Sequence, residues 1–227
     1  MSVRFDTIAD YLDNQDSPAL PAALAPVSFS MWFYVTSMPA GVNALVFNFF
    51  ADNLDAACDI YVRESDKMVQ ANNGVGGGAV GHDIATIALG TWHCAQISKS
   101  SSQFNVYLDG AKFGFTETAR TVNPPRNAHI GGYGGGSRLN VGYVTYARTW
   151  TVALTDDELA AERCSAVPVR TSGLYGAYPL ATNANDASGN ANHWTSHGSP
   201  VYSAFEPTLP NLAPIPGRVR RAQFVYG

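Results

Sequence analysis

Apolar and polar residues alternate along much of this chain, most clearly in residues 88–114, ALGTWHCAQISKSSSQFNVYLDGAKFG. The alternation has a period of two in 91–98 and again in 104–108, and this period predicts β-strands. Residues 99–103 are polar and predict a turn between these strands. Asp109-Gly110 tolerates the positive φ angles of a two-residue hairpin loop. The stretch therefore predicts two paired strands followed by a tight hairpin into a third.

Another segment, residues 28–36, carries aromatic side chains on both of its predicted faces. Trp32 and Tyr34 share one face, opposite Phe29 and Phe33. Such a strand is either covered on both sides or lines a concave surface. Core packing is the expected role of Trp32, because aromatic side chains dominate the cores of sandwiches. Further strands are expected at 3–12, 44–51, 59–63, 67–71 and 139–150.

Residues 153–161 have the signature of a helix rather than of a strand. Thr155 is an N-cap candidate, and Glu158 stands three residues later, as a capping box requires. Asp156 and Asp157 add negative charge at the positive end of the helix dipole. These acidic residues therefore have a structural explanation, and we expect them to take no part in catalysis.

The paired strands carry two short motifs, Gly90-Thr91-Trp92-His93 and Val106-Tyr107-Leu108-Asp109-Gly110. With this spacing they resemble the laminin-G-like, concanavalin A-like jelly-roll family. Phe5-Asp6 and Asp10-Tyr11-Leu12 resemble the opening strand of that family, and His129-Ile130-Gly131-Gly132 resembles a later strand start. Where the family often has Gly-x-Ile-Asp, this chain has Thr145 in place of the acidic residue, so the role of that acid is not carried over.

The resemblance implies an all-β fold, a two-sheet antiparallel jelly-roll sandwich of the concanavalin A-like type, with one short helix. We expect residues 1–206 to form this domain and 207–227 to form an extended, Pro-rich C-terminal arm. Residues 173–190 resemble a segment that usually stands at the front of such domains. Here it should complete the sandwich from the back, because too few residues remain for a second one. This fold hosts lectins, hydrolases and structural modules, so it does not define the function.

Composition excludes several kinds of partner. The formal net charge of the 227 residues is −4, which gives no field for nucleic acid. The N-terminus lacks a basic segment followed by an apolar run, and no apolar run approaches the ~20 residues that span a bilayer. We therefore expect a protein made in a host cytoplasm without a signal peptide, and no nucleic-acid or membrane partner.

The three cysteines, Cys58, Cys94 and Cys164, lack the spacing of a zinc site, and a buried free thiol is expected at Cys94.

One loop has residues that suit a calcium ion. Asp186-Ala187-Ser188-Gly189-Asn190 offers carboxylate, hydroxyl and carbonyl oxygens, which are the hard ligands that calcium takes. Asp186 and Asn190 are the candidate ligands. The alternative is an ordinary Asx turn, in which Asp and Asn side chains bond their own backbone. Apart from this possible calcium ion, no cofactor is expected.

The C-terminal arm is the candidate region for docking on a partner. It combines a small basic cluster with an apolar end, and the candidate docking residues are Arg218, Arg220, Arg221, Phe224 and Tyr226. An extended segment with such anchors can add to a neighbour's sheet or groove. A frayed or self-docked terminus is the alternative.

Three functions are compatible with these observations. The domain layout resembles virion proteins of tailed bacteriophages, which implies a non-enzymatic structural or adhesive module, a capsid decoration or tail accessory protein that docks on other virion subunits and on itself. A calcium-assisted lectin that binds surface glycans is the alternative. Suitable residue types are Trp32, Tyr34, Asn72, Asn73, His193 and Trp194, although the sequence does not gather them in one site.

A glycoside hydrolase is the third candidate. Hydrolases of this fold typically show Glu-x-Asp-x-x-Glu, and the chain has no such run. The short acidic pairs Asp52/Asp55 and Glu64/Asp66 stand in predicted turns. We therefore expect the protein not to be an enzyme.

Overall fold

The computed structural model describes residues 1–7, 9–15, 26–51, 56–73, 80–116, 125–132 and 141–211 of the chain. This part holds fifteen strands and one helix. In chain order they are β1 (Ser2–Phe5), β2 (Tyr11–Gln15), β3 (Val27–Ser37), β4 (Ala44–Ala51), β5 (Ala56–Val62), β6 (Met68–Asn73), β7 (Val80–Thr86), β8 (Trp92–Lys99), β9 (Gln103–Leu108), β10 (Ala111–Thr116), β11 (Pro125–Ile130), β12 (Val141–Trp150), α1 (Asp156–Arg163), β13 (Leu174–Tyr178), β14 (Thr195–His197) and β15 (Val201–Ser203).

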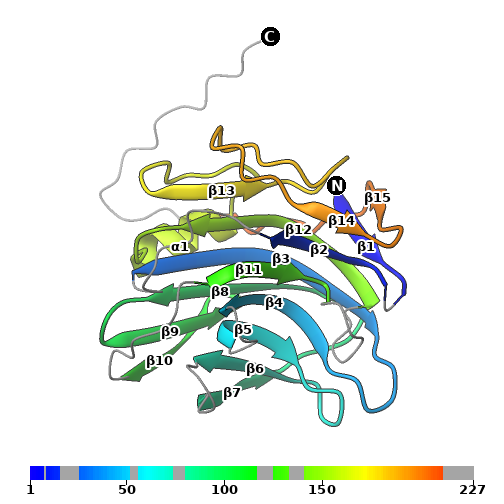
Figure 1. Ribbon diagram of the computed structural model, residues 1–227. Coiled ribbons are helices and arrows are strands. Elements are labelled where there is room, and N and C mark those ends of the chain that lie inside the picture. Colours follow the sequence, from blue (N-terminus) through cyan, green and yellow to red (C-terminus); the bar gives the residue numbers. More distant parts are fainter. Residues whose placement is uncertain are drawn as a thin grey trace.

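The strands form two antiparallel sheets that pack face to face (Figure 1). Sheet A has the order β10-β9-β8-β3-β12-β1-β15, with β13 also paired to β12, and sheet B has the order β14-β2-β11-β4-β5-β6-β7. The predicted two-sheet sandwich with one short helix is confirmed. The segment after residue 173 supplies β13, β14 and β15, so it completes both sheets as expected.

The central strand β3 shows why the chain forms a two-layered core. Its residues Phe29, Met31 and Phe33 are fully buried and point between the sheets, where burying each side chain stabilises the fold by about 1.5–3 kcal/mol. Trp32 points the other way and is also buried, and its indole Nε1 donates to the carbonyl of Arg163, 3.3 Å away. The strand is thus covered on both sides, as its aromatic pattern predicts.

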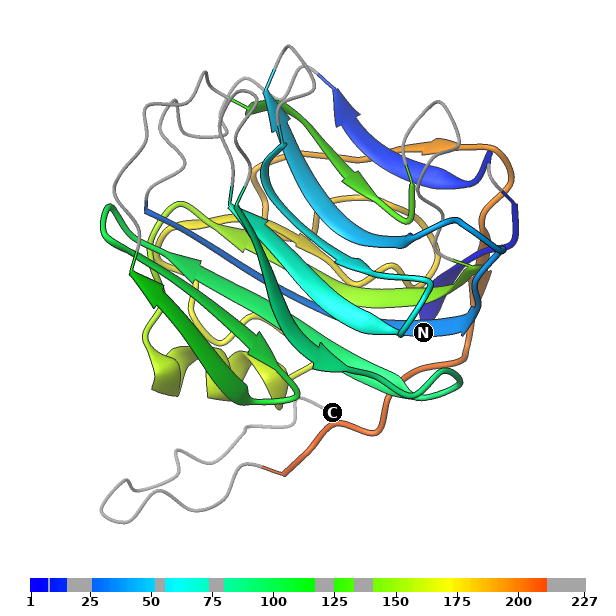
Figure 2. The ribbon, with the colours of Figure 1, turned by 90° about the horizontal axis from the view of Figure 1, so that it is seen from below.

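Helix α1 covers part of the outer face of sheet A (Figure 2). The expected capping box is present, because the Glu158 amide donates to Thr155 Oγ1 and the Thr155 amide donates to the Glu158 carboxylate. The helix residue Leu159 is buried and packs against Trp150 and Tyr107 of sheet A. Glu158 therefore caps the helix, as the sequence predicts, and Asp156 accepts the Tyr107 hydroxyl at 2.7 Å and the Lys112 ammonium at 2.9 Å.

Thr145 stands where two strands meet on one edge of β12. β1 pairs with residues 142–144, and β13 pairs with 147–150. On the opposite edge, the register of β12 with β3 shifts between Thr145 and Arg148, where Tyr146 has a φ of +51°. The fully buried Thr145 hydroxyl lies 2.7 Å from the Met1 carbonyl and 2.9 Å from the Pro179 carbonyl. At this position the threonine therefore joins two chain segments, a role that a carboxylate, having no proton to donate, would not fill.

The hairpin motifs of the sequence join β8 to the turn between β9 and β10 through side-chain hydrogen bonds. His93 Nδ1 lies 2.7 Å from Asp109 Oδ2, and His93 Nε2 lies 3.1 Å from the carbonyl of Ala88. The other oxygen of Asp109 accepts the amide hydrogen of Cys94 at 2.8 Å. Asp109 and Gly110 have φ angles of +53° and +92°, as the predicted hairpin turn requires. The family motif at this place is therefore structural.

Asp10, from the opening motif, ties the two ends of the domain together. Its Oδ2 accepts the amides of Asp6 and Thr7, and its Oδ1 accepts the amide of Ser199 at 2.8 Å. Burial raises the pKa of this carboxyl, but the three backbone donors outweigh burial and lower it overall. A Cβ at Gly198, whose φ is +71°, would lie 2.3 Å from Asp10 Oδ1, so glycine is needed there.

The cysteines are free thiols, with Cys58 and Cys94 buried. Burial raises the pKa of Cys94 far above its usual range, so this side chain acts as a small apolar group. Separately, no helix in the described ranges has the length and apolarity to cross a membrane.

Candidate functional site

A row of polar side chains crosses the outer face of sheet B. The register aligns them one per strand on five neighbouring strands: Asp13 of β2, His129 of β11, Asn48 of β4, Asp59 of β5 and Asn72 of β6. Their sequence neighbours Leu12, Ile130, Ile60 and Ala71 point the other way, into the core. None of the five is more than 9% exposed. We call these five residues the polar row.

Hydrogen bonding within the polar row fixes the state of its histidine. His129 Nδ1 lies 3.1 Å from Asn48 Oδ1. Burial lowers the pKa of His129 to about 4, partly opposed by Asp13, so the ring is neutral at pH 7. Since the amide oxygen can only accept, Nδ1 carries the ring hydrogen. The other amide atom, Asn48 Nδ2, is buried and has no hydrogen-bond partner among the described residues. An unpaired buried donor of this kind costs about 1–3 kcal/mol.

The row reaches more exposed side chains at the β14 edge. The ring of His197 stacks on that of Tyr11, with centroids 4.3 Å apart and planes 6° apart. His197 Nε2 lies 3.0 Å from Asp13 Oδ2, which orients the imidazole. This edge therefore presents two flat rings beside a buried carboxylate.

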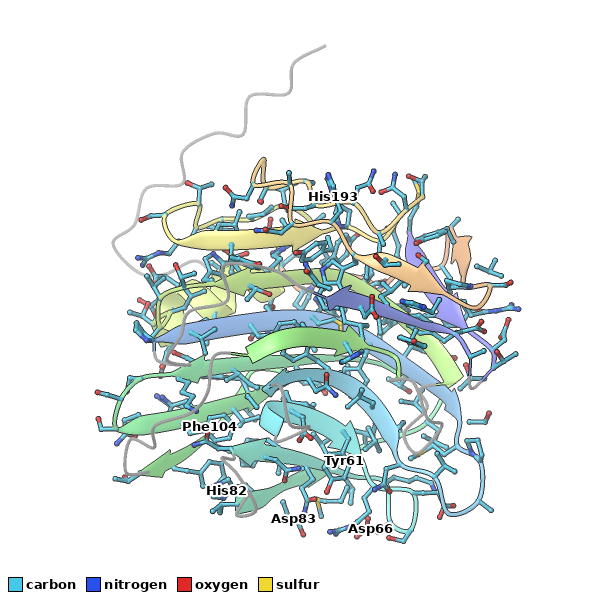
Figure 3. The ribbon with its side chains drawn as sticks, viewed as in Figure 1. Tyr61, Asp66, His82, Asp83, Phe104 and His193 are labelled. Carbon is cyan, nitrogen blue, oxygen red and sulfur yellow. The ribbon has the colours of Figure 1, made fainter. Side chains whose placement is uncertain are left out.

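At the β7 edge the same face ends in a network around Arg63. The guanidinium contacts Asp66 at 2.6 Å and Asp83 at 3.2 Å, and Gln70 Nε2 donates to Asp83 at 2.8 Å. Figure 3 shows Asp66 and Asp83 close together at this edge, with Tyr61 on a neighbouring strand. Both carboxylates are nearly half exposed. We call Arg63, Asp66, Gln70 and Asp83 the Arg63 network.

The carboxylates on this face lack the properties of a glycosidase pair. Asp13 and Asp59 are three strand spacings apart, about 14 Å, which exceeds the separations used for retention or inversion of the sugar. Asp66 and Asp83 are close together, but Arg63 lowers the pKa of Asp66 to about 2. Such a carboxyl holds no proton to donate as a general acid. The described carboxylates Asp13, Asp59, Asp66 and Asp83 are therefore placed to accept hydrogen bonds.

A second group of side chains lies on the outer face of sheet A. Tyr143, Tyr34 and Trp92 are direct cross-strand partners on β12, β3 and β8. Phe205 follows β15 and contacts all three rings, with centroid distances of 4.8, 5.0 and 5.3 Å. Trp92 Nε1 is buried and lacks a partner in the described part of the chain. We call these four residues the aromatic patch.

The predicted calcium ligands bond to their own loop and to strand β13. Asp186 Oδ1 accepts the amides of Ala177 and Ser188, and Oδ2 accepts the Ser188 hydroxyl and the Asn192 amide. The Asn190 side chain donates to the carbonyls of Leu174 and Tyr175. The described residues contain no cluster of three or more His, Cys, Asp or Glu side chains able to hold a metal. These bonds favour the Asx-turn interpretation.

The structure separates the residue types proposed for a sugar site. Trp32 and Trp194 are buried, Tyr34 belongs to the aromatic patch, Asn72 belongs to the polar row, and the exposed His193 accepts the Asp186 amide through Nδ1. Asp52 and Asp55 lie outside the described residues, as do the candidate docking residues Arg218, Arg220, Arg221, Phe224 and Tyr226.

The polar row is not among the features predicted from the sequence, although a signal for it was present. Asn48 and Asp59 each interrupt a run of apolar residues, ALVFNFFA and AACDIYV. A polar residue inside a buried strand needs a partner, and its cross-strand neighbours are the nearest ones.

Together, the two sheets and the polar outer face of sheet B define a concanavalin A-like antiparallel sandwich. A laminin G family model, described as the concanavalin A-like lectin/glucanases superfamily, matches residues 6–160. The chain belongs to this superfamily, which confirms the resemblance seen in its motifs. No curated protein matches the chain in sequence.

Solved structures support the same fold. A Bacteroides ovatus protein described as carbohydrate-binding aligns with a TM-score of 0.68 at 14% identity, over 92% of this chain and 61% of its own. A mutant of Trypanosoma rangeli sialidase with trans-sialidase activity aligns with a TM-score of 0.50 at 14% identity, over 60% of this chain and 22% of its own. The chain thus spans about three fifths of the Bacteroides protein, and these similarities concern the fold.

Proposed function

We propose that the protein is a non-catalytic carbohydrate-binding module whose ligand lies along the outer face of sheet B. The polar row is the observation that carries this proposal. A glycan presents hydroxyl groups that both donate and accept, so it is recognised by fixed acceptors and donors. The row supplies carboxylate and amide groups in a line across five strands, and burial holds their rotamers in place.

The exposed ends of the face would make the direct contacts. Gln70 and Asp83 offer an amide and a carboxylate at the β7 edge, and Tyr11 and His197 offer flat rings at the β14 edge. Preorganised side chains of this kind reduce the entropy that is lost on binding. The Bacteroides protein of the same fold is described as carbohydrate-binding, which supports the same class of ligand.

A glycan array with the purified full-length protein tests this proposal, once with calcium and once with chelator. We expect specific glycans to bind equally in both conditions, because Asp186 already accepts four hydrogen bonds, three from its own loop and one from β13. Binding that disappears with chelator would instead support the calcium interpretation of Asp186 and Asn190. A blank array in both conditions would contradict the proposal. Incubation of the bound glycans with the protein should release no shorter product.

A structural role on a bacteriophage virion is the second candidate, and the C-terminal segment is the observation that favours it. Phe205 rests on the aromatic patch, and Glu206 accepts a hydrogen bond from the Tyr146 hydroxyl at 2.9 Å. The chain therefore reaches residue 211 from a fixed place on sheet A. Such a place suits an arm that ties the domain to neighbouring subunits.

Removing the basic cluster of the arm tests this second role. We expect the triple variant Arg218→Ala, Arg220→Ala, Arg221→Ala to bind phage particles at least about tenfold more weakly in co-sedimentation, since three charge contacts would be lost. Its thermal stability should match that of the wild type. Unchanged particle binding would rule out the arm as the attachment element.

A further inference from the structure

The aromatic patch has the composition of a protein interface rather than of a surface that faces solvent. Tyr34, Trp92 and Tyr143 remain half-buried although Phe205 lies over them, and Phe205 itself is 41% exposed. Two exposed aliphatic residues belong to the same sheet or adjoin it: Val201 is the first residue of β15, and Leu89 stands just before β8. Aromatic side chains are enriched at interfaces, and exposed apolar patches mark sites of association.

One polar atom in the patch also lacks a partner. Trp92 Nε1 is buried, and neither Phe205 nor any other described residue accepts its hydrogen. A buried donor left unpaired costs about 1–3 kcal/mol, so a complex in which the covering segment shifts and an acceptor reaches Nε1 would be stabilised. The segment that carries Phe205 covers the rings without meeting this requirement.

The charges around the patch suit a second copy of the same chain. Arg4 and Asp6 lie at its edge as a pair, and Glu206 lies beside Tyr146. Both signs are therefore present, and a two-fold axis can bring opposite charges together.

The arm adds a further complementary charge. The formal net charge is −4, and the three arginines of residues 212–227 contribute +3, so the rest of the chain carries −7. This basic arm begins a few residues after Phe205. A neighbouring copy presents the acidic body that such an arm would attract.

We propose that the aromatic patch is the surface on which a second copy of this chain docks, so that the protein is a dimer with Phe205 and Trp92 at the centre of a two-fold interface. Large aromatic side chains at the centre of an interface carry most of its binding energy. The dimer uses the outer face of sheet A, so the second copy does not cover the outer face of sheet B. It is therefore independent of glycan binding.

Sedimentation equilibrium of the full-length chain tests this inference. We expect a wild-type dimer at about 100 μM, and at least a tenfold larger dissociation constant for Phe205→Glu, because a buried unpaired charge opposes association. Trp92→Phe, which removes only the indole N–H and part of the ring, should weaken the dimer about threefold to tenfold.

A matched control is Val167→Glu, which adds the same charge at a residue that is 63% exposed after helix α1. This variant should dimerise like the wild type. The inference is overturned by a wild-type chain that stays monomeric at about 100 μM, or by equal weakening in Phe205→Glu and Val167→Glu. In the first case the patch would be open to another occupant, such as a sugar ring. Circular dichroism of each variant shows whether it is folded.

Discussion

Replacing Glu162 by alanine should lower the free energy of unfolding by about 3–5 kcal/mol, the range found when one partner of a buried ion pair is removed. Arg148 Nη1 and Glu162 Oε2 are 2.6 Å apart, and neither side chain is more than 2% exposed. The second oxygen of Glu162 accepts the amides of Val169 and Arg170 at 2.9 and 2.7 Å. The variant would leave the buried Arg148 guanidinium without its counter-charge, and the amides of Val169 and Arg170 without their acceptor.

Denaturant unfolding measures this effect, with two comparison variants. Glu162→Gln keeps an acceptor for the two amides but removes the charge that faces Arg148, so we expect an intermediate loss. Asp157→Ala removes an exposed charge from the same helix and should change stability by less than about 1 kcal/mol. A loss below about 1 kcal/mol for Glu162→Ala would show that the pair does not hold helix α1 on sheet A.

Replacing Asp109 should cause the second largest loss in the free energy of unfolding. Asp109→Ala removes the acceptor of the Cys94 amide and the partner of His93, and it places alanine at a φ of +53°. We expect a loss of roughly 3 kcal/mol. Asparagine tolerates the positive φ and keeps an oxygen for the Cys94 amide. Asp109→Asn should therefore lower the free energy of unfolding by about 1–2 kcal/mol, because only the interaction with His93 is weakened.

The pH dependence of this loss identifies its cause. Burial lowers the pKa of His93, but its bonds to Asp109 and to the Ala88 carbonyl outweigh burial and raise it above the usual 6.5. The stabilisation is therefore complete below about pH 6.5 and is lost as the pH rises through the raised pKa. The stability difference between the wild type and Asp109→Asn should accordingly be larger near pH 5 than near pH 8.5. A difference that is constant over this range would contradict a charged His93–Asp109 pair.

The sequence predicted those features that depend on local pattern. Alternation predicted the strands around Trp92 and Phe104, and the spacing of Thr155 and Glu158 predicted the capped helix. The motif residues His93 and Asp109 identified the family. In the structure, their side chains are hydrogen-bonded to each other and join β8 to the turn between β9 and β10.

The polar row and the aromatic patch could not be predicted in this way, because they depend on pairing between distant strands. Asp13, Asn48 and His129 become neighbours only through the register of β2, β11 and β4. Register is decided by which faces are buried and by turn geometry, and a shift of one residue moves every side chain to the other face. Phe205 lies in a segment without periodicity, so nothing in its surroundings indicates that it packs on Tyr34.

The central claim is that the outer face of sheet B binds glycans, and the most direct test is a calorimetric titration with a glycan selected on the array. The matched proteins are the wild type, the double variant Gln70→Ala, Asp83→Ala on sheet B, and Lys112→Ala, an exposed change on β10 of sheet A. We expect the double variant to bind at least about tenfold more weakly, from the loss of two polar contacts, and Lys112→Ala to bind like the wild type. Equal affinity of all three proteins would contradict the claim.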